Sequence, residues 1–408
     1  MAIRTHRTIR ILFTAVVLAA AVFVACNRTI FVMGILYPMF RFTLASMIVV
    51  LFSIRPNLKD AFFVVCLTVL HGVVAYLLFY LPYQSILWPA FAGLSSFWVL
   101  CIRTIWSNDL ELGVQVYATI SAVLLLTVES GAATVLNWTE RLHPKTLDLF
   151  LYSFDGSLGT QFSFLMGQAF AKWPLFRITA VTFYSGLPVA IALICAQQIA
   201  KRKRKGLSAV AALVFTGPIG VIFYNFFPAL GPRLIAQLHF PFQILTRAQT
   251  MTLAVVEVAA PGPRNAIPSL HMAWVLLIWW YSRGMRWWIR GIAMLFLIFT
   301  VAATMGSGEH YFVDLVVGIP FAAFIEALFS LELPWRDRRR IIPLAWGLGS
   351  TLIWLALLRF ENPLFWISPI VPWGLVAATI LFTWFYERGL QSAAVLPETV
   401  LSFGLSST

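Results

Sequence analysis

Long apolar runs separated by short polar or basic segments recur along the whole chain. A run of about 20 apolar residues is long enough for an α-helix to cross a bilayer, where only helices and closed barrels satisfy their backbone polar groups. The pattern predicts an all-α polytopic membrane protein with about twelve transmembrane helices. The expected spans lie near 11–26, 30–54, 61–82, 84–102, 113–136, 174–198, 206–227, 269–282, 287–305, 311–331, 341–358 and 369–386.

The segment 140–173 departs from this pattern. It carries His143 and an acidic, apolar stretch that reaches Asp155. We interpret it as one or two helices that lie in the membrane interface rather than across the bilayer. Three interpretations are open for Asp148 and Asp155: contact with a polyol headgroup, helix capping, or a solvated helix face.

The amino-acid composition indicates the same class of protein. Of the 408 residues, 60% are hydrophobic and 11% are charged, and the mean hydropathy is +0.86. Soluble proteins have about 45–50% apolar and about 25% charged residues, so an ordinary soluble enzyme is excluded. The four cysteines lie in or beside apolar runs without the spacing of a metal site or a disulfide framework. We therefore expect no metal site among them.

The net charge of +13 results from 29 Lys and Arg against 16 Asp and Glu. A basic chain suits nucleic acid, but basic residues also collect in the cytoplasmic loops of membrane proteins. With the N-terminus inside, 19 of the 29 basic residues fall on inside segments. We therefore expect cytoplasmic N- and C-termini and no nucleic-acid partner. A bacterial inner membrane is the preferred location, and a Golgi-type membrane stays open as the alternative.

The longest expected outside loop, 228–268, keeps Arg233, Arg247 and Arg264 on the face where basic residues are scarce. The chain then enters the next span through Pro-Ser-Leu-His at Pro268–His271. Ser269 should lie in the first helical turn, where free backbone N–H groups favour an anion. This loop is a candidate phosphate-binding region.

A second outside corner runs from Gly306 to Asp314 and contains His310. His310 and Asp314 are four residues apart and share one face of a helix, so the carboxylate can fix the tautomer of the ring and leave its other nitrogen as a nucleophile or base. The turn between the two spans is basic and lies inside, so His271 and His310 both end at the outside surface. Phosphoryl transfer needs a nucleophile, an acid for the leaving oxygen and cations for the phosphate oxygens, and these residues supply all three.

These motifs resemble those of the type 2 phosphatidate phosphatase superfamily. Pro268–His271 resembles its second motif, and the stretch from His310 to Asp314 resembles the end of its third. The Ser-Leu-His and His-Tyr-x-x-Asp forms look most like the inositol phosphorylceramide synthase branch, whose divergent first motif resembles 224–233. The resemblance covers roughly 113–331, and its specific motifs lie within 224–314.

The resemblance implies a six-helix catalytic core and a two-step reaction that needs no metal or other cofactor. In such a reaction His310 attacks phosphorus and forms a phosphohistidine, while Asp314 orients its ring. His271 protonates the leaving oxygen, and Ser269 and Arg233 hold phosphate oxygens.

The chain departs from the phosphatase pattern on the cationic side of the expected pocket. Ala303 and Thr304 stand where phosphatase members usually have Ser-Arg, and no Lys opens the first motif. Arg264 is our candidate for the missing phosphate-binding cation. The same departures favour a lipid phosphotransferase over a simple monophosphatase.

We therefore expect an integral-membrane lipid phosphotransferase or lipid phosphatase that acts on the extracytoplasmic face. Its substrate would be a lipid phosphate or phospholipid, with a polyol as acceptor. Water as acceptor stays open and would make it a lipid phosphate or isoprenoid pyrophosphate phosphatase. A membrane transporter is the rival from another class, but no repeat links 1–200 to 206–408.

The expected organisation has three parts. Residues 1–112 form N-terminal transmembrane helices without an assigned role, 113–331 form the catalytic core, and 332–408 form C-terminal helices and a tail.

Overall fold

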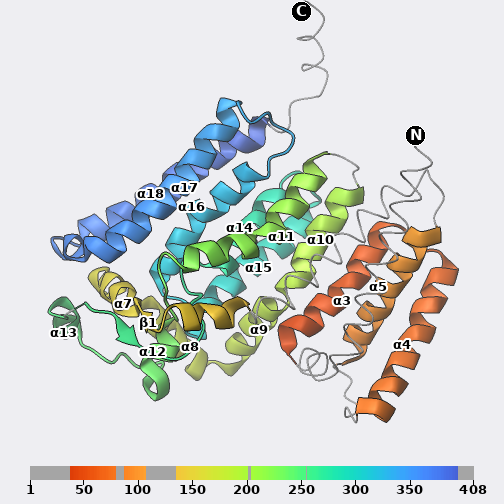
Figure 1. The fold of residues 1–408 in the computed structure, drawn as a ribbon, viewed down its shortest axis with the longest axis horizontal. Coiled ribbons are helices and arrows are strands. Elements are labelled where there is room, and N and C mark those ends of the chain that lie inside the picture. Colours follow the sequence, from red (N-terminus) through yellow and green to blue (C-terminus); the bar gives the residue numbers. More distant parts are fainter. Residues whose placement is uncertain (1–36, 80–86, 107–134, 201–203, 254, 394–408) are drawn as a thin grey trace, which may run out of the picture. The chain divides into compact units, whose positions relative to one another are not determined.

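The computed structural model describes residues 37–79, 87–106, 135–200, 204–253 and 255–393, and most of these residues are helical (Figure 1). The predicted all-α class is confirmed. The chain divides into two compact units, Met1–Thr134 with Thr182–Gly206, and Val135–Val181 with Leu207–Thr408.

The first unit is a set of apolar helices in which α5 packs against both α3 and α4, and α3 also packs against α10. Their bounds are α3 (Pro38–Ser53), α4 (Leu58–Phe79), α5 (Trp88–Trp106) and α10 (Leu187–Ala200). Two further helices cross the boundaries between the units: α9 (Pro174–Ser185) and α11 (Arg204–Tyr224).

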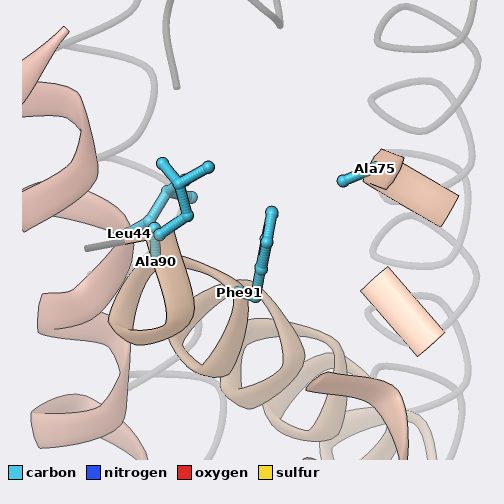
Figure 2. Close-up of a cluster of buried hydrophobic side chains, with 5 residues drawn as sticks. Leu44, Ala75, Ala90 and Phe91 are labelled. Atoms are coloured by element: carbon cyan, nitrogen blue, oxygen red, sulfur yellow. The ribbon is translucent and has the colours of Figure 1, made fainter. Parts of the chain in front are cut away.

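A small apolar cluster holds α3, α4 and α5 together. Phe91 of α5 lies among Leu44 of α3 and Ala75 of α4 (Figure 2). The close approach of α3 and α5 depends on Gly93, because a Cβ atom there would overlap the backbone carbonyl of Leu44. Burial of these side chains away from water or lipid headgroups stabilises the unit.

The second unit contains all of the predicted site residues. In it, α16 packs against α7, α14, α17 and α18. Its helices are α7 (Asp148–Ser157), α8 (Phe162–Lys172), α12 (Pro232–Ala236), η2 (Gln237–His239), α13 (Arg247–Met251), α14 (Leu270–Tyr281), α15 (Trp287–Gly306), α16 (Phe312–Leu328), α17 (Arg338–Phe360), η3 (Asn362–Trp366) and α18 (Ile370–Ala393).

Two short strands join the segment before α7 to the long loop before α14. Strand β1 (Lys145–Thr146) pairs antiparallel with β2 (Val258–Ala259), with Lys145 opposite Ala259. The segment 140–173 thus contains β1 and the two short helices α7 and α8, as its polar interruptions predicted. Its place in the membrane interface stays a prediction.

The apolar helices indicate a membrane protein, but twelve spans and a six-helix core are not confirmed. Among the described residues five helices are long and apolar enough to cross a bilayer, or six if α9 and α10 form one broken span. Several other expected spans form shorter apolar helices: Pro38–Ser53, Ser208–Tyr224 and Leu270–Tyr281. The expected span 11–26 and residues 113–134 of another lie outside the described residues.

Candidate active site

The two predicted catalytic histidines lie in direct contact. His271 is the second residue of α14, and His310 lies two residues before the start of α16. Their ring centroids are 5.7 Å apart, and Nδ1 of His271 is 3.4 Å from Nε2 of His310. The fold therefore brings together two side chains that are 39 residues apart in the sequence.

The contacts of His310 define its tautomer. Its Nδ1 lies 2.8 Å from the carbonyl oxygen of Ala266. A carbonyl oxygen only accepts, so Nδ1 carries the proton and donates it, which leaves the lone pair on Nε2. Burial lowers the pKa of His310 to about 4, although the charge of Glu309 and the hydrogen bond to Ala266 oppose this shift. The ring is therefore neutral at neutral pH, and the lone pair of its Nε2 faces Nδ1 of His271.

Asp314 lies beside the same ring, as the spacing predicted. Its Oδ2 is 3.5 Å from Nδ1 of His310 and accepts a hydrogen bond from the backbone N–H of Tyr311 at 2.7 Å. The side chain is fully buried. A carboxylate in this position favours any positive charge that develops on the imidazole ring during reaction. The carbonyl of Ala266, which the sequence did not indicate, shares the orienting function.

Asp148 anchors the expected first motif. Its two carboxylate oxygens accept hydrogen bonds from the backbone N–H groups of Leu230 at 2.9 Å and Gly231 at 2.8 Å, and it also accepts from the hydroxyl of Thr146. Burial raises the pKa of Asp148, and these hydrogen bonds oppose that rise. These contacts hold the loop before α12, so they favour a structural function of Asp148 over a headgroup contact.

The loop that Asp148 anchors places Arg233 beside Gly308 and Glu309, directly before His310. Nη2 of Arg233 lies 3.0 Å from Oε1 of Glu309, and its backbone N–H donates to the carbonyl of Gly308 at 3.0 Å. Gly231 has φ +109, and a Cβ atom there would overlap the carbonyl of Glu309. The side chain of Arg233 is 53% exposed, and a phosphate contact by its guanidinium stays a prediction.

Asp155 caps the start of α16, the helix that follows His310. Its Oδ2 accepts from the backbone N–H of Phe312 at 2.8 Å and its Oδ1 from that of Val313 at 3.1 Å. Burial raises the pKa of Asp155, and the hydrogen bond from Phe312 opposes that rise. Asp148 and Asp155 are seven residues apart, which places them on one face of α7. That spacing was the available signal in the sequence for a shared structural role.

Ser269 is the N-cap of α14. Its Oγ accepts from the backbone N–H of Met272 at 3.3 Å, and its own N–H donates to the backbone carbonyl of Asp314 at 3.0 Å. These bonds tie the starts of α14 and α16 together, so they bring the second and third motifs into register. A phosphate contact by the Ser269 hydroxyl stays a prediction.

Arg264 has a different environment from the one expected of a phosphate ligand. It is fully buried, and its guanidinium donates to four backbone carbonyls at 2.5–3.1 Å. Burial lowers the pKa of Arg264. The carbonyls belong to His143, Pro144, Ala260 and Gly262. These contacts hold the β1 and β2 segments together, so they favour a structural function over the phosphate contact that we predicted.

The other histidines among the described residues have contacts of their own or lie on the surface. Nδ1 of His71 lies 3.0 Å from the hydroxyl of Ser95 on a neighbouring helix, and Nε2 of His143 lies 2.9 Å from Oδ1 of Asn225. His239 is exposed. Within the described residues, no group of three or more His, Cys, Asp or Glu side chains is placed to hold a metal ion.

Comparison with known families gives one match. Residues 149–328, less than half of the chain, match the family model described as the PAP2 superfamily. This match supports PAP2 superfamily membership, and the segment includes α7, α14, α15 and α16 with His271, His310 and Asp314. No curated protein and no solved structure matches the chain.

Members of the PAP2 superfamily are phosphatases or phosphotransferases, so the match indicates an enzyme of one of these two kinds. The apolar helices place that enzyme in a membrane, where a lipid phosphate is a plausible substrate. The match does not distinguish the inositol phosphorylceramide synthase branch.

Proposed function

We propose that this protein is an integral-membrane enzyme that cleaves a phosphate ester or anhydride of a lipid and passes the phosphoryl group to an alcohol or to water. The observation that carries the proposal is the contact between His271 and His310 next to Asp314. One ring has a defined lone pair and an adjacent carboxylate, and the second ring is within proton-transfer distance of it.

In the first step, Nε2 of His310 attacks phosphorus while the bond from phosphorus to the leaving oxygen breaks. His271 enters the step as an imidazolium and gives a proton to that oxygen, which departs as an alcohol or a phosphate, so the ring of His271 becomes neutral. The Nδ1 proton of His310 stays on its bond to Ala266, and Asp314 stabilises the positive phosphoimidazole ring. Arg233 and the first turn of α14, capped by Ser269, compensate the charge on the phosphate oxygens.

In the second step, the oxygen of the acceptor attacks the phosphohistidine. His271, now neutral, takes the proton of the acceptor, the N–P bond breaks, and Nε2 recovers its lone pair. Water as acceptor releases phosphate, whereas a polyol yields a phosphorylated polyol. The absence of the Ser-Arg pair, with Ala303 and Thr304 in its place, favours the transfer to an alcohol as in the inositol phosphorylceramide synthase branch.

The contact between His271 and His310 must open before a phosphate can reach Nε2 of His310. A near-attack arrangement needs about 3–3.5 Å between the nucleophile and phosphorus alone, and the whole gap between the two rings is 3.4 Å. His310 is buried and held by Ala266, whereas His271 is half-buried. We therefore expect the ring of His271 to rotate away when substrate binds.

The distribution of basic residues supports an extracytoplasmic site and cytoplasmic termini, and a bacterial inner membrane is our preferred location. Accessibility of Arg233→Cys and of a cysteine placed in the turn between α14 and α15 to a membrane-impermeant thiol reagent would test this orientation in whole cells. Labelling from the outside at Arg233 but not at the turn is expected.

The central test is capture of the covalent intermediate. The full-length protein in detergent would be mixed with lipid phosphates and phospholipids whose phosphorus is labelled, then quenched in alkali, where phosphohistidine survives. We expect label on the wild-type chain and none on His310→Ala, with His239→Ala, an exposed histidine, as the matched control. Undiminished labelling of His310→Ala would refute the assignment of the nucleophile.

The acceptor is decided by product analysis of the same reactions. Release of inorganic phosphate alone identifies a phosphatase, and formation of a phosphorylated polyol in the presence of inositol or glycerol identifies a phosphotransferase. Failure of every phosphate ester and anhydride to label the protein or to turn over would refute the proposed function.

A further inference from the structure

We propose that Asp155 is a positioning residue for His310, and that the C-terminal hairpin α17–η3–α18 holds Asp155 in place through α7. This inference rests on the proposed function, because it concerns the geometry of the nucleophile. It gives a role to the C-terminal helices, which lie outside the residues that match the PAP2 superfamily.

The backbone around His310 is held at nearly every hydrogen-bonding group. The three N–H groups that follow it, those of Tyr311, Phe312 and Val313, donate to the carboxylates of Asp314 and Asp155. N–H groups at the start of a helix have no partner within the helix, so carboxylates that accept from them stabilise the helix. Asp155 supplies two of the three contacts, and it comes from a different helix.

His310 itself is fixed by two further hydrogen bonds. Its backbone carbonyl accepts from the hydroxyl of Ser163 at 2.6 Å, and its N–H donates to the carbonyl of Thr304 at 3.2 Å. Loss of Asp155 would therefore release only the side of the nucleophile that faces α16. We expect the ring to shift rather than the whole corner to unfold.

Side chains of the C-terminal hairpin form hydrogen bonds with the turn of α7 that precedes Asp155. The hydroxyl of Ser153 donates to Oδ1 of Asn362 at 2.7 Å and accepts from Nε1 of Trp366 at 3.0 Å. Nδ2 of Asn362 donates to the carbonyl of Phe150 at 3.1 Å. Ser153 and Asn362 are both buried, so these bonds form away from competing water.

Two aromatic contacts also join the C-terminal hairpin to Phe154 of α7. The ring of Phe154 meets that of Phe365 edge to face at 4.7 Å and that of Trp354 at 5.4 Å. At the end of α7, Nε1 of Trp373 donates to the carbonyl of Leu158 at 3.2 Å. All three partners belong to α17, η3 or α18, so each element of the hairpin contacts the helix that carries Asp155.

The first experiment compares Asp155→Ala and Asp155→Asn in the full-length protein. Displacement of a reacting group by about 1 Å can cost roughly 100-fold in rate, so we expect kcat to fall by about that factor in Asp155→Ala with KM changed little. Asp155→Asn keeps one acceptor oxygen and should lose less. The control is Asp60→Ala, which removes a carboxylate that accepts a backbone N–H at the start of α4 in the other unit.

The measurements separate positioning from simple loss of folded protein. Rates are normalised to folded protein from size-exclusion chromatography, and hydrogen exchange is followed on peptides that cover 304–316. Faster exchange there together with a lower kcat in Asp155→Ala, and wild-type kcat in Asp60→Ala, supports the proposal. Wild-type kcat in Asp155→Ala, with or without faster exchange, overturns it, as does an equal loss in Asp60→Ala.

The second experiment tests the path from the hairpin. Asn362→Ala should lower kcat several-fold, but it should add little in the Asp155→Ala background, because both changes act through the same contact. Fully multiplicative effects would overturn the role of the hairpin. If the wild-type protein turns over no phosphate ester or anhydride, the proposed function fails, and hydrogen exchange of 304–316 in the same variants still decides whether the hairpin and Asp155 hold the nucleophile.

Discussion

The sequence predicts two arginines as ligands of the same phosphate, but they lie in opposite environments. Substitution of each arginine therefore tests whether it binds phosphate or stabilises the fold. Arg264 is buried and donates to four backbone carbonyls, whereas Arg233 is about half exposed and pairs with Glu309. We expect Arg264→Ala to impair stability and Arg233→Ala to impair catalysis.

The magnitudes follow from these contacts. A hydrogen bond is worth about 1 kcal/mol net, so loss of four should lower the free energy of unfolding in Arg264→Ala by about 4 kcal/mol. An exposed ion pair is worth about 0–1 kcal/mol, so Arg233→Ala should unfold much like the wild-type protein. Removal of one donor that stabilises developing charge typically costs about 100–1,000-fold in rate, and we expect a loss of that order for Arg233→Ala.

Stability and activity are measured on the same preparations of each variant. Unfolding is followed by thermal denaturation in detergent, and kcat/KM is measured with the lipid phosphate that labels the wild-type protein, per amount of folded protein. A stable Arg264→Ala variant with a large loss of kcat/KM would refute the structural function and reinstate Arg264 as a phosphate ligand. An Arg233→Ala variant with wild-type kcat/KM would remove Arg233 from the site.

Three further predictions concern acidity, the leaving group and packing. Since burial lowers the pKa of His310 to about 4, phosphoenzyme formation should persist as the pH falls from 7 to about 5; a midpoint near 6.5 would indicate a solvated ring. On acidification the unfolded chain takes up a proton on His310 before the folded protein does. The free energy of unfolding should therefore fall as the pH is lowered from about 6.5 to about 4, which denaturation measured at each pH would show. His271→Ala should slow cleavage of an alkyl phosphate by about 100–10,000-fold but affect an aryl phosphate much less, because an aryl oxide leaves without a proton; equal losses would contradict its function as an acid. Gly93→Ala should lower the free energy of unfolding by about 1–3 kcal/mol through overlap with Leu44, whereas Gly374→Ala, with nothing within 4 Å, should not; equal denaturation curves would contradict the packing argument.

Helix periodicity and span length predicted the class of fold and the positions of most described helices. Both are local properties of the sequence, since a run of apolar residues forms a helix in a bilayer whatever its neighbours are. The number of spans was less well predicted. The expected span 269–282, for example, is a helix of only 12 residues in the structure, whereas a helix that crosses a bilayer needs about 20 residues.

The proximity of His310 and Asp314 could also be predicted from the sequence. His310 and Asp314 are four residues apart, so one turn of helix geometry brings them together. The contact between His271 and His310 required a further argument, that two successive spans return the chain to the same face. The contact in the structure agrees with that argument.

The functions of the remaining charged residues depended on contacts between distant segments. Nothing near Arg264 in the sequence shows that the carbonyl groups of His143 and Pro144 lie against its guanidinium, so a loop arginine on the outer face was interpreted as a phosphate ligand. Asp148 and Asp155 were ambiguous for the same reason. Their partners, the N–H groups of Leu230 and Phe312 among others, are more than 80 residues away.

The sequence by itself determined that this is a helical membrane protein with His271, His310 and Asp314 as its candidate chemical groups, because apolar run length and helical spacing act over a few turns of chain. Only the tertiary structure decided which charged groups are buried and hold the site together and which of them are exposed. A buried charge must find partners wherever the packing of helices places them, and that packing joins α7, α16 and the C-terminal hairpin across more than 200 residues of chain.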